Sequence, residues 1–168
     1  MVRSHDLTTG RELGAEFTPK ILALVCTFCT YTAADMAGSA RMQYPANVRI
    51  VKYLCTGRID ILHILKGFEV GADGIMVSGC EVGSCHFVEG NLRARERVEY
   101  ARQLLEECGL GAERLVMYEV AASEAPKWVA AVKEMTERVT ALGPNPLNPL
   151  WGPAAVVPEE QPELAVQR

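Results

Sequence analysis

Five of the six cysteines stand at or just after the end of short apolar runs. The run ILALV is followed by a C-x-x-C (Cys26, Cys29), the run VRIVKYL by Cys55, and the run GIMVSG by a C-x-x-x-x-C (Cys80, Cys85). Thiolate sulfur is the soft ligand of zinc, copper(I) and iron–sulfur clusters. If the runs are neighbouring parallel strands, all five sulfurs gather at one sheet edge. We therefore expect a metal, an iron–sulfur cluster or a redox disulfide there.

A 2Fe–2S cluster takes four cysteine ligands, so five candidates compete for four places. Two other interpretations stay open. Cys26 and Cys29 could form a dithiol–disulfide oxidoreductase motif, which leaves the other three cysteines unexplained. The set could also hold a structural zinc in an interaction module, although structural zinc is typical of domains with small cores.

Two further residues with possible ligand side chains, Cys108 and His86, have simpler interpretations. Cys108 continues an apolar helix stripe (Ala94, Val98, Ala101, Leu105) and is expected to be structural. His86 follows Cys85 and could replace a thiolate ligand, although a lone loop histidine is typically a surface group. The arginines near Glu96 and Glu99 are expected to form a solvated helix face.

The elements that would position the cysteines alternate β-branched runs with amphipathic segments. We expect strands at residues 21–25, 48–54, 74–78 and 114–120, and helices at 33–42, 59–69 and 91–108. A last helix is expected after Ser123, which can cap it, with a buried stripe of Trp128, Val132, Met135, Val139 and Leu142.

Alternating strands and helices predict βα units in a small, doubly wound α/β domain with a mainly parallel sheet. In open sheets of this kind, binding sites form outside the carboxyl ends of the strands, where Cys26, Cys55 and Cys80 fall. We expect an N-terminal extension at residues 1–18, the domain at 19–143 and a proline-rich tail at 144–168, lying extended over a partner or over the domain itself.

Composition excludes several classes of function. The chain has 168 residues with a net charge of −4, and it has no long run of lysine and arginine, which argues against nucleic acid as a partner. Its longest apolar stretch is far shorter than the roughly 20 residues that span a bilayer. The N-terminus lacks the apolar core of a signal peptide, so we expect a cytoplasmic protein with reduced cysteines. No set of residues stands out as a general acid and base.

Two stretches carry a family resemblance: CTFCTYTAADMAGSARMQYPANVRIVKYLCTGRID and GADGIMVSGCEVGSCHFVEGN. Together they closely resemble the delta subunit of methyl-viologen-reducing hydrogenase, over residues 19–142. The resemblance implies a small flavodoxin-like fold carrying one 2Fe–2S cluster. It implies that the family's cysteine positions fall on Cys26, Cys29, Cys55, Cys80 and Cys85.

The resemblance also implies a role without catalysis of its own. Such a subunit relays electrons between an input oxidoreductase (a hydrogenase, a formate dehydrogenase or another enzyme) and the flavin-bearing A subunit of a heterodisulfide-reductase-type complex. Flavin-based electron bifurcation takes place in that flavoprotein. The extensions at both ends depart from the family pattern, and we expect them to serve as adapters to a particular partner.

Overall fold

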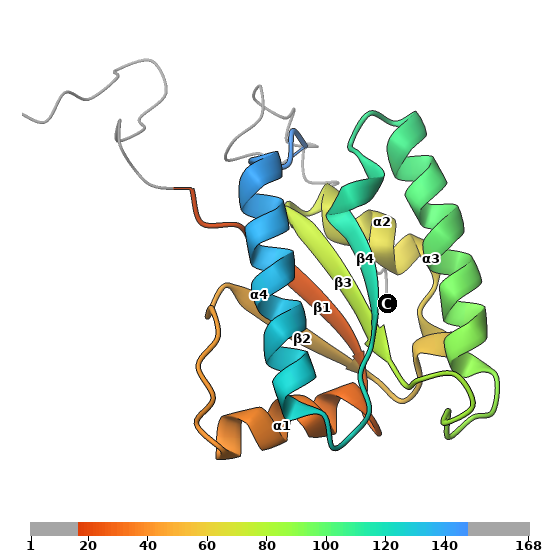
Figure 1. Cartoon of the computed structure of the whole chain (residues 1–168). Helices are drawn as coiled ribbons and strands as arrows, with labels where there is room; N and C mark the ends of the chain where they lie inside the picture. The colour runs from red at the N-terminus through yellow and green to blue at the C-terminus, as the bar shows by residue number, and fades with distance from the viewer. Residues whose placement is uncertain (1–16, 148–168) are drawn as a thin grey trace, which may run out of the picture.

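The fold is built on one four-stranded sheet whose strands all run parallel. The structure is a computed structural model and describes residues 17–147. The strands are β1 (Ile21–Cys26), β2 (Val48–Tyr53), β3 (Gly74–Gly79) and β4 (Leu115–Glu119), in the order β2-β1-β3-β4 (Figure 1). This order is that of a flavodoxin-like sheet. The predicted small α/β class is therefore confirmed.

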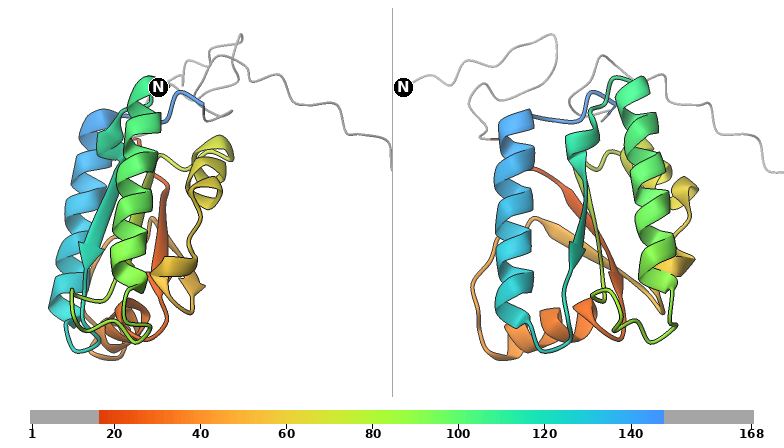
Figure 2. Two further views of the ribbon diagram at one scale, coloured as in Figure 1. Left: turned by 90° about the vertical axis from the view of Figure 1, so that its right-hand side faces the viewer. Right: turned by 45° about the vertical axis from the view of Figure 1, so that its right-hand side comes forward.

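Helices cover both faces of the sheet. The long helices are α1 (Thr30–Ser39), α2 (Ile61–Glu69), α3 (Gly90–Glu107) and α4 (Ala125–Leu142), and the 3-10 turns are η1 (Thr56–Arg58) and η2 (Ala112–Arg114). Helices α1 and α4 lie on one face and α2 and α3 on the other (Figure 2). Each face has its own core, around Trp128 on one side and Phe68 on the other. No helix within residues 17–147 combines the length and hydropathy needed to cross a membrane.

Position in the sheet decides how far each strand is buried. All six residues of β3 are buried, because β3 has a strand on each side and helices on both faces. Strand β2 forms an edge, and its apolar side chains Ile50 and Val51 are exposed. Residues of similar hydrophobicity therefore end in different environments.

Some helix ends differ from the prediction. Helix α1 begins at Thr30, directly after Cys29, and ends at Ser39. The N-cap of α4 is Glu124 and not Ser123, and the Glu124 carboxylate accepts a hydrogen bond from the Ala121 N–H at 2.8 Å. A carboxylate at this end also suits the positive end of the helix dipole.

Leu142 is partly exposed, contrary to the predicted stripe of α4. Val139, one turn earlier, packs against Gly74 at the start of β3. Leu142 therefore extends past the beginning of the sheet, where no core remains to cover it. The other four members of that stripe are buried as predicted.

The prediction that Cys108 continues the buried stripe of α3 was wrong. Ala94, Val98, Ala101 and Leu105 are buried, but the helix ends at Glu107, and the chain then turns through Gly109 with φ 74°. Cys108 is therefore exposed. Arg97 also departs from the expected solvated face, since its guanidinium donates to the carbonyls of Gly57 and Ile59 at 2.7 and 2.9 Å.

A buried polar network closes the amino edge of the sheet. The Asp73 carboxylate accepts hydrogen bonds from the backbone N–H groups of Lys20 and Asn145, both at 2.8 Å. The Asn145 amide donates to the carbonyls of Phe68 and Ala72. Arg114 donates to four carbonyls on this edge and to that of Leu110. Asn145 thus anchors the first residues after α4 to the domain, whereas residues 148–168 and 1–16 lie outside the described part of the chain.

Candidate metal centre

The register of the sheet brings the cysteines together. Cys26 is the last residue of β1 and pairs with Tyr53, the last residue of β2, so Cys55 follows two residues after the end of β2. Cys80 comes directly after β3, which is the other neighbour of β1. The point between β1 and β3 is where the chain switches from one direction of winding to the other, and ligands bind at such points in open α/β sheets.

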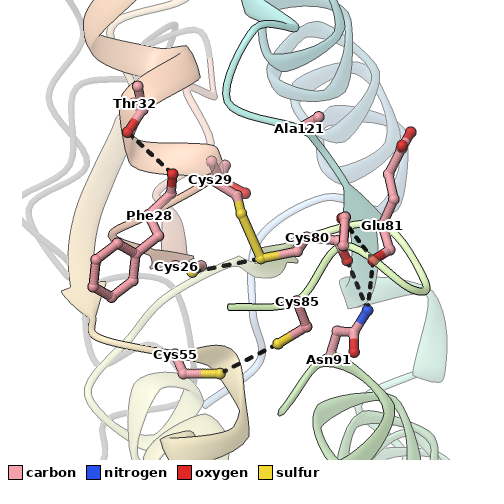
Figure 3. The surroundings of a disulfide bond; sticks show 12 residues. Cys26, Phe28, Cys29, Thr32, Cys55, Cys80, Glu81, Cys85, Asn91 and Ala121 are labelled. Carbon is pink, nitrogen blue, oxygen red and sulfur yellow. Dashed lines mark hydrogen bonds between the residues drawn. A yellow bond between two sulfur atoms is a disulfide. The ribbon is translucent and has the colours of Figure 1, made fainter. Parts of the chain in front are cut away.

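Three of the sulfurs form one compact group. The Sγ atoms of Cys26, Cys29 and Cys80 all lie within 4.8 Å of one another, and those of Cys26 and Cys80 are 3.9 Å apart. Cys29 and Cys80 are joined as a disulfide, with Cα atoms 5.5 Å apart (Figure 3). In a metal centre these two residues would instead act as thiolates. Residue 29 therefore faces the sheet edge although it lies in the turn that leads into α1.

The other two sulfurs form a pair beside this group. Cys55 Sγ and Cys85 Sγ are 3.9 Å apart, and Figure 3 shows both pairs on the same edge of the domain. Cys55 is buried and Cys85 is half-buried. The predicted convergence of the five cysteines is thus found in the structure. The C-x-x-C motif is not closed on itself, because Cys29 pairs with Cys80 and not with Cys26.

Backbone N–H groups at the start of α3 stabilise negative charge on Cys85. Burial raises the pKa of the Cys85 thiol, but hydrogen bonds from the backbone of Asn91, Phe87 and Gly90 and from the Cys55 side chain more than offset this effect. The pKa of Cys85 therefore lies below its ordinary value. A thiolate that accepts several N–H bonds at a helix N-terminus is well suited to bind a cation.

The pKa of Cys55 is shifted in the opposite direction. Burial raises the pKa of its thiol, and the neighbouring Cys85 and Cys26 raise it further, whereas a hydrogen bond from the Gly57 backbone lowers it. The net pKa is above the ordinary value. A bound metal cation would favour the thiolate form of both adjacent cysteines.

Two glycines allow η1 and α3 to approach closely around Cys55. A Cβ atom at Gly90 would collide with Cys55 Sγ and lie 3.3 Å from Cys85 Sγ. A Cβ atom at Gly57 would lie 2.8 Å from the Gly90 Cα. Arg97 fixes the same contact from α3 through its bonds to η1. Any side chain at position 90 would therefore displace the cysteine pair.

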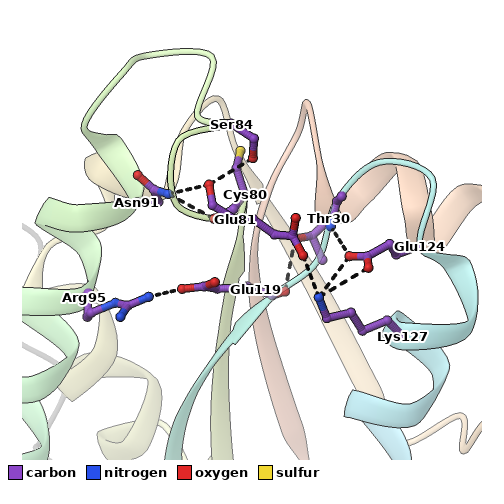
Figure 4. Close-up of polar contacts among 11 residues, drawn as sticks. Thr30, Cys80, Glu81, Ser84, Asn91, Arg95, Glu119, Glu124 and Lys127 are labelled. Atoms are coloured by element: carbon purple, nitrogen blue, oxygen red, sulfur yellow. Dashed lines mark hydrogen bonds and ion pairs between the residues drawn. The ribbon is translucent and has the colours of Figure 1, made fainter.

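Asn91 is a positioning residue that the sequence analysis did not identify. It is buried, and its amide donates to the carbonyls of Cys80 and Glu81 at 3.1 and 2.8 Å (Figure 4). It thereby ties the loop between β3 and α3 to the start of the helix. An asparagine at the first turn of the clearest helix, just after the Cys85 loop, was the available signal, because asparagine is preferred where backbone groups need side-chain partners.

Ion pairs attach the loop between β3 and α3 to the start of α4. The Lys127 ammonium lies 2.9 Å from the Glu81 carboxylate and also contacts Glu124, which links the loop to the start of α4 (Figure 4). Thr30 and Ser78 share a buried hydrogen bond of 3.0 Å between α1 and β3. The segments that carry Cys29 and Cys80 are thus held to each other and to α4.

The remaining candidates lie on the surface around the cysteines. His86 is exposed and stacks on Phe28, with ring centroids 4.4 Å apart, and meets Phe87 edge-on. It belongs to this aromatic group and is not one of the residues whose ligand atoms cluster with Cys26. Arg58 is exposed next to Cys55.

The donor set fits a soft metal centre. Five sulfurs lie at one edge, backbone N–H groups point at one of them, and a glycine leaves room for another. Thiolate sets with such hydrogen bonds hold iron–sulfur clusters and zinc. A carboxylate- or water-rich set, which hard cations such as magnesium prefer, is not present among the residues described at this edge.

Comparison with known proteins identifies the family to which this chain belongs. Residues 21–143 match the model of the family "Methyl-viologen-reducing hydrogenase, delta subunit". The vhu iron-sulfur subunit of the F420-non-reducing hydrogenase of Methanocaldococcus jannaschii is 54% identical over 130 residues, which cover 77% of this chain and 97% of that protein. Its counterpart in Methanopyrus kandleri is 48% identical over 124 residues, which cover 74% and 94%.

A third relative is a much larger protein. It is the A subunit of the ferredoxin/F(420)H(2)-dependent CoB-CoM heterodisulfide reductase of Methanosarcina acetivorans. It is 32% identical over 126 residues, which cover 75% of this chain but only 16% of that protein. A segment similar to this chain is thus part of a longer polypeptide there. From the matched family model and these relatives, we conclude that this chain belongs to the family of the delta subunit of methyl-viologen-reducing hydrogenase.

Proposed function

We propose that this chain is an electron-transfer subunit that carries one 2Fe–2S cluster. Four of the five clustered cysteines, Cys26, Cys29, Cys55, Cys80 and Cys85, would hold the cluster as thiolates. The protein would relay electrons in the cytoplasm between an input oxidoreductase, such as a hydrogenase or formate dehydrogenase, and the flavin-bearing A subunit of a heterodisulfide-reductase-type complex. Flavin-based electron bifurcation would then take place in that flavoprotein and not in this chain.

The single observation that carries the proposal is the convergence of the five sulfurs at the switch point of the sheet. The names of the two hydrogenase relatives add iron and sulfur as the elements of their centre. The name of the third relative supports the A subunit of a heterodisulfide reductase as a partner.

The surrounding residues would control the centre in three ways. When bound, a 2Fe–2S cluster supplies one-electron redox chemistry. The N–H groups at the start of α3 stabilise negative charge on Cys85. The buried positions of Cys26, Cys55 and Cys80 keep water from most of the sulfur atoms. Asn91 and Arg97 keep the loops that carry Cys80 and Cys55 in place. Hydrogen bonds and burial of these kinds set the reduction potential of a cluster.

The test is a measurement of iron and acid-labile sulfide on anaerobically purified protein, with visible spectra before and after dithionite. We expect two irons and two sulfides per chain and a colour that bleaches on reduction. Cys80→Ser should lose most of the iron, and Cys108→Ser, in which an exposed cysteine is replaced, should retain it. Stoichiometric zinc without a reducible chromophore, or a metal-free protein that reduces disulfides, would refute the proposal in favour of the zinc or dithiol interpretation.

A further inference from the structure

A groove of about 650 Å³ opens on the surface next to Cys55. Its walls come from the end of β2, from η1 and from the loop that leads into α3. Cys55 and Gly90, both buried, are among the residues that line it. The groove therefore reaches Cys55 from outside, beside the edge strand of the sheet.

Apolar side chains stand exposed around this groove. Val88 is 78% exposed, Leu54 65% and Phe87 50%, and all three line it. Val88 also adopts a left-handed backbone conformation with φ 65°. A β-branched residue is disfavoured in that conformation, and a glycine or asparagine would fit it better. The fold does not bury the Val88 side chain, so packing within this chain does not offset its backbone strain. This combination points to a role in contact with another molecule.

The charge of the groove is opposite to that of the chain. Lys52, Arg58 and Arg93 line it together with one carboxylate, Glu89, which leaves a net charge of +2, whereas the whole chain carries −4. Glu89 pairs with Arg93 at 3.4 Å, and Lys52 lies over the Tyr31 ring. Arg58 is exposed and has no ion-pair partner among residues 17–147. The groove is thus a cationic site with an apolar rim.

We propose that this groove is the docking surface for the A-type flavoprotein, which would contribute an apolar side chain flanked by carboxylates. The proposal rests on the proposed function and adds the face and the chemistry of the contact. The apolar rim requires a partner with a complementary apolar surface, which a small anion lacks. In the Methanosarcina relative, a segment similar to this chain is part of the same polypeptide as the A-type protein, so an A-type surface is available to it permanently.

The groove lies next to the proposed cluster site, so a protein bound in it would be placed to exchange electrons with the cluster. Electrons leave or enter a buried centre through the shortest path, and the groove is lined by the sulfur-bearing residue Cys55 itself. The compact group of Cys26, Cys29 and Cys80 lies at the ends of β1 and β3, the two strands in the middle of the sheet. A partner seated in the groove would therefore approach the centre from the Cys55 and Cys85 side.

The test measures the dissociation constant between the iron-loaded protein and the separately purified A-type flavoprotein from the same organism. Two variants change the groove, Val88→Asn and Arg58→Glu. Val88→Asn removes the apolar contact and relieves the left-handed backbone, so it should fold at least as well as the wild type. Two matched controls lie elsewhere on the surface. Val70→Asn makes the same substitution at an exposed valine after α2, and Lys133→Glu makes the same change of charge on the exposed face of α4.

We expect each groove variant to weaken binding at least tenfold and each control to change it less than twofold. The effect of Arg58→Glu should shrink at 1 M salt, where the Debye length is about 3 Å, whereas that of Val88→Asn should persist. Iron content, measured for every variant, should equal that of the wild type.

Three results would overturn the proposal. If the wild type binds the A-type flavoprotein and both groove variants bind equally well, the groove is not the docking face, although the proposed function stands. If the groove variants instead abolish self-association seen by sedimentation of the wild type, the occupant is a second copy of this chain. If iron-loaded wild type does not bind the A-type flavoprotein at all, both the docking proposal and the proposed partner fail.

Discussion

Replacing Gly90 by alanine tests whether the close contact between α3 and Cys55 shapes the cysteine edge. Gly90 does not have a positive φ, so alanine is compatible with the backbone, and any cost comes from the added methyl group. That methyl group would collide with Cys55 Sγ and lie 3.3 Å from Cys85 Sγ. The Cys55 sulfur or the start of α3 would therefore have to move.

The expected magnitude follows from two opposing effects. Alanine is favoured over glycine in a helix interior by about 1 kcal/mol, and by less at a helix end. Forcing a methyl group into a filled site costs about 1–3 kcal/mol. We therefore expect Gly90→Ala to lower the free energy of unfolding of the reduced, metal-free protein by about 0–2 kcal/mol. We also expect it to lower the bound iron per chain, because the Cys55–Cys85 pair is displaced.

Gly38→Ala is the matched control. Gly38 lies in α1, and a Cβ atom there meets nothing within 4 Å, so only the helix preference remains. This variant should be neutral or more stable by up to about 1 kcal/mol, with unchanged iron. Urea unfolding under reducing conditions and iron analysis after anaerobic reconstitution compare the two variants. Equal stability and equal iron content in both would refute the argument that position 90 must lack a side chain.

Three further predictions concern the residues that hold the loops and the sheet edges. Asn91→Leu should lower the free energy of unfolding by about 2–3 kcal/mol in urea titrations, because two loop carbonyls lose their buried donor. Asn145→Ala should cost about 2–4 kcal/mol by the same assay, because its buried amide bonds two carbonyls; an unchanged stability would mean that the segment after α4 is not anchored. The Ala121 N–H and Lys127 lower the pKa of Glu124 below its ordinary 4.5, so its contribution is present above pH 4.5 and lost as pH falls through the lowered value. The melting temperature of Glu124→Gln should therefore be lower than that of the wild type at neutral pH, and the two should converge in acid.

Several features of the fold could be predicted from the sequence because they depend on local patterns. The four strands lie within one or two residues of their predicted ends, since each is a short apolar run bounded by turn residues. Gly71 and Gly109 both take positive φ after helix ends, where glycine is the residue typical of that conformation. The helix ends that were wrong, at Thr30 and at Glu124, depend on caps whose choice is decided by neighbouring loops and not by propensity.

The gathering of the cysteines was also predictable, because the carboxyl ends of parallel strands share one edge of a sheet. The pairing within the group was not. Cys29 meets Cys80 and Cys55 meets Cys85, and both pairs join residues from different loops. The path of those loops depends on Asn91 and on the close approach of η1 to Gly90, which no local pattern encodes.

By itself, the sequence determined the order and type of the elements, the parallel sheet and the edge at which the thiols gather, because these follow from periodicity and strand direction. Only the tertiary structure decided which side chains are covered. Strand β2 contains β-branched residues like those of the buried strands, yet it lies at the edge and leaves Ile50 and Val51 exposed. Cys108 follows the spacing of a buried stripe, yet the helix ends before it. Burial depends on how many neighbours an element acquires, and a residue's own type and spacing do not specify that number.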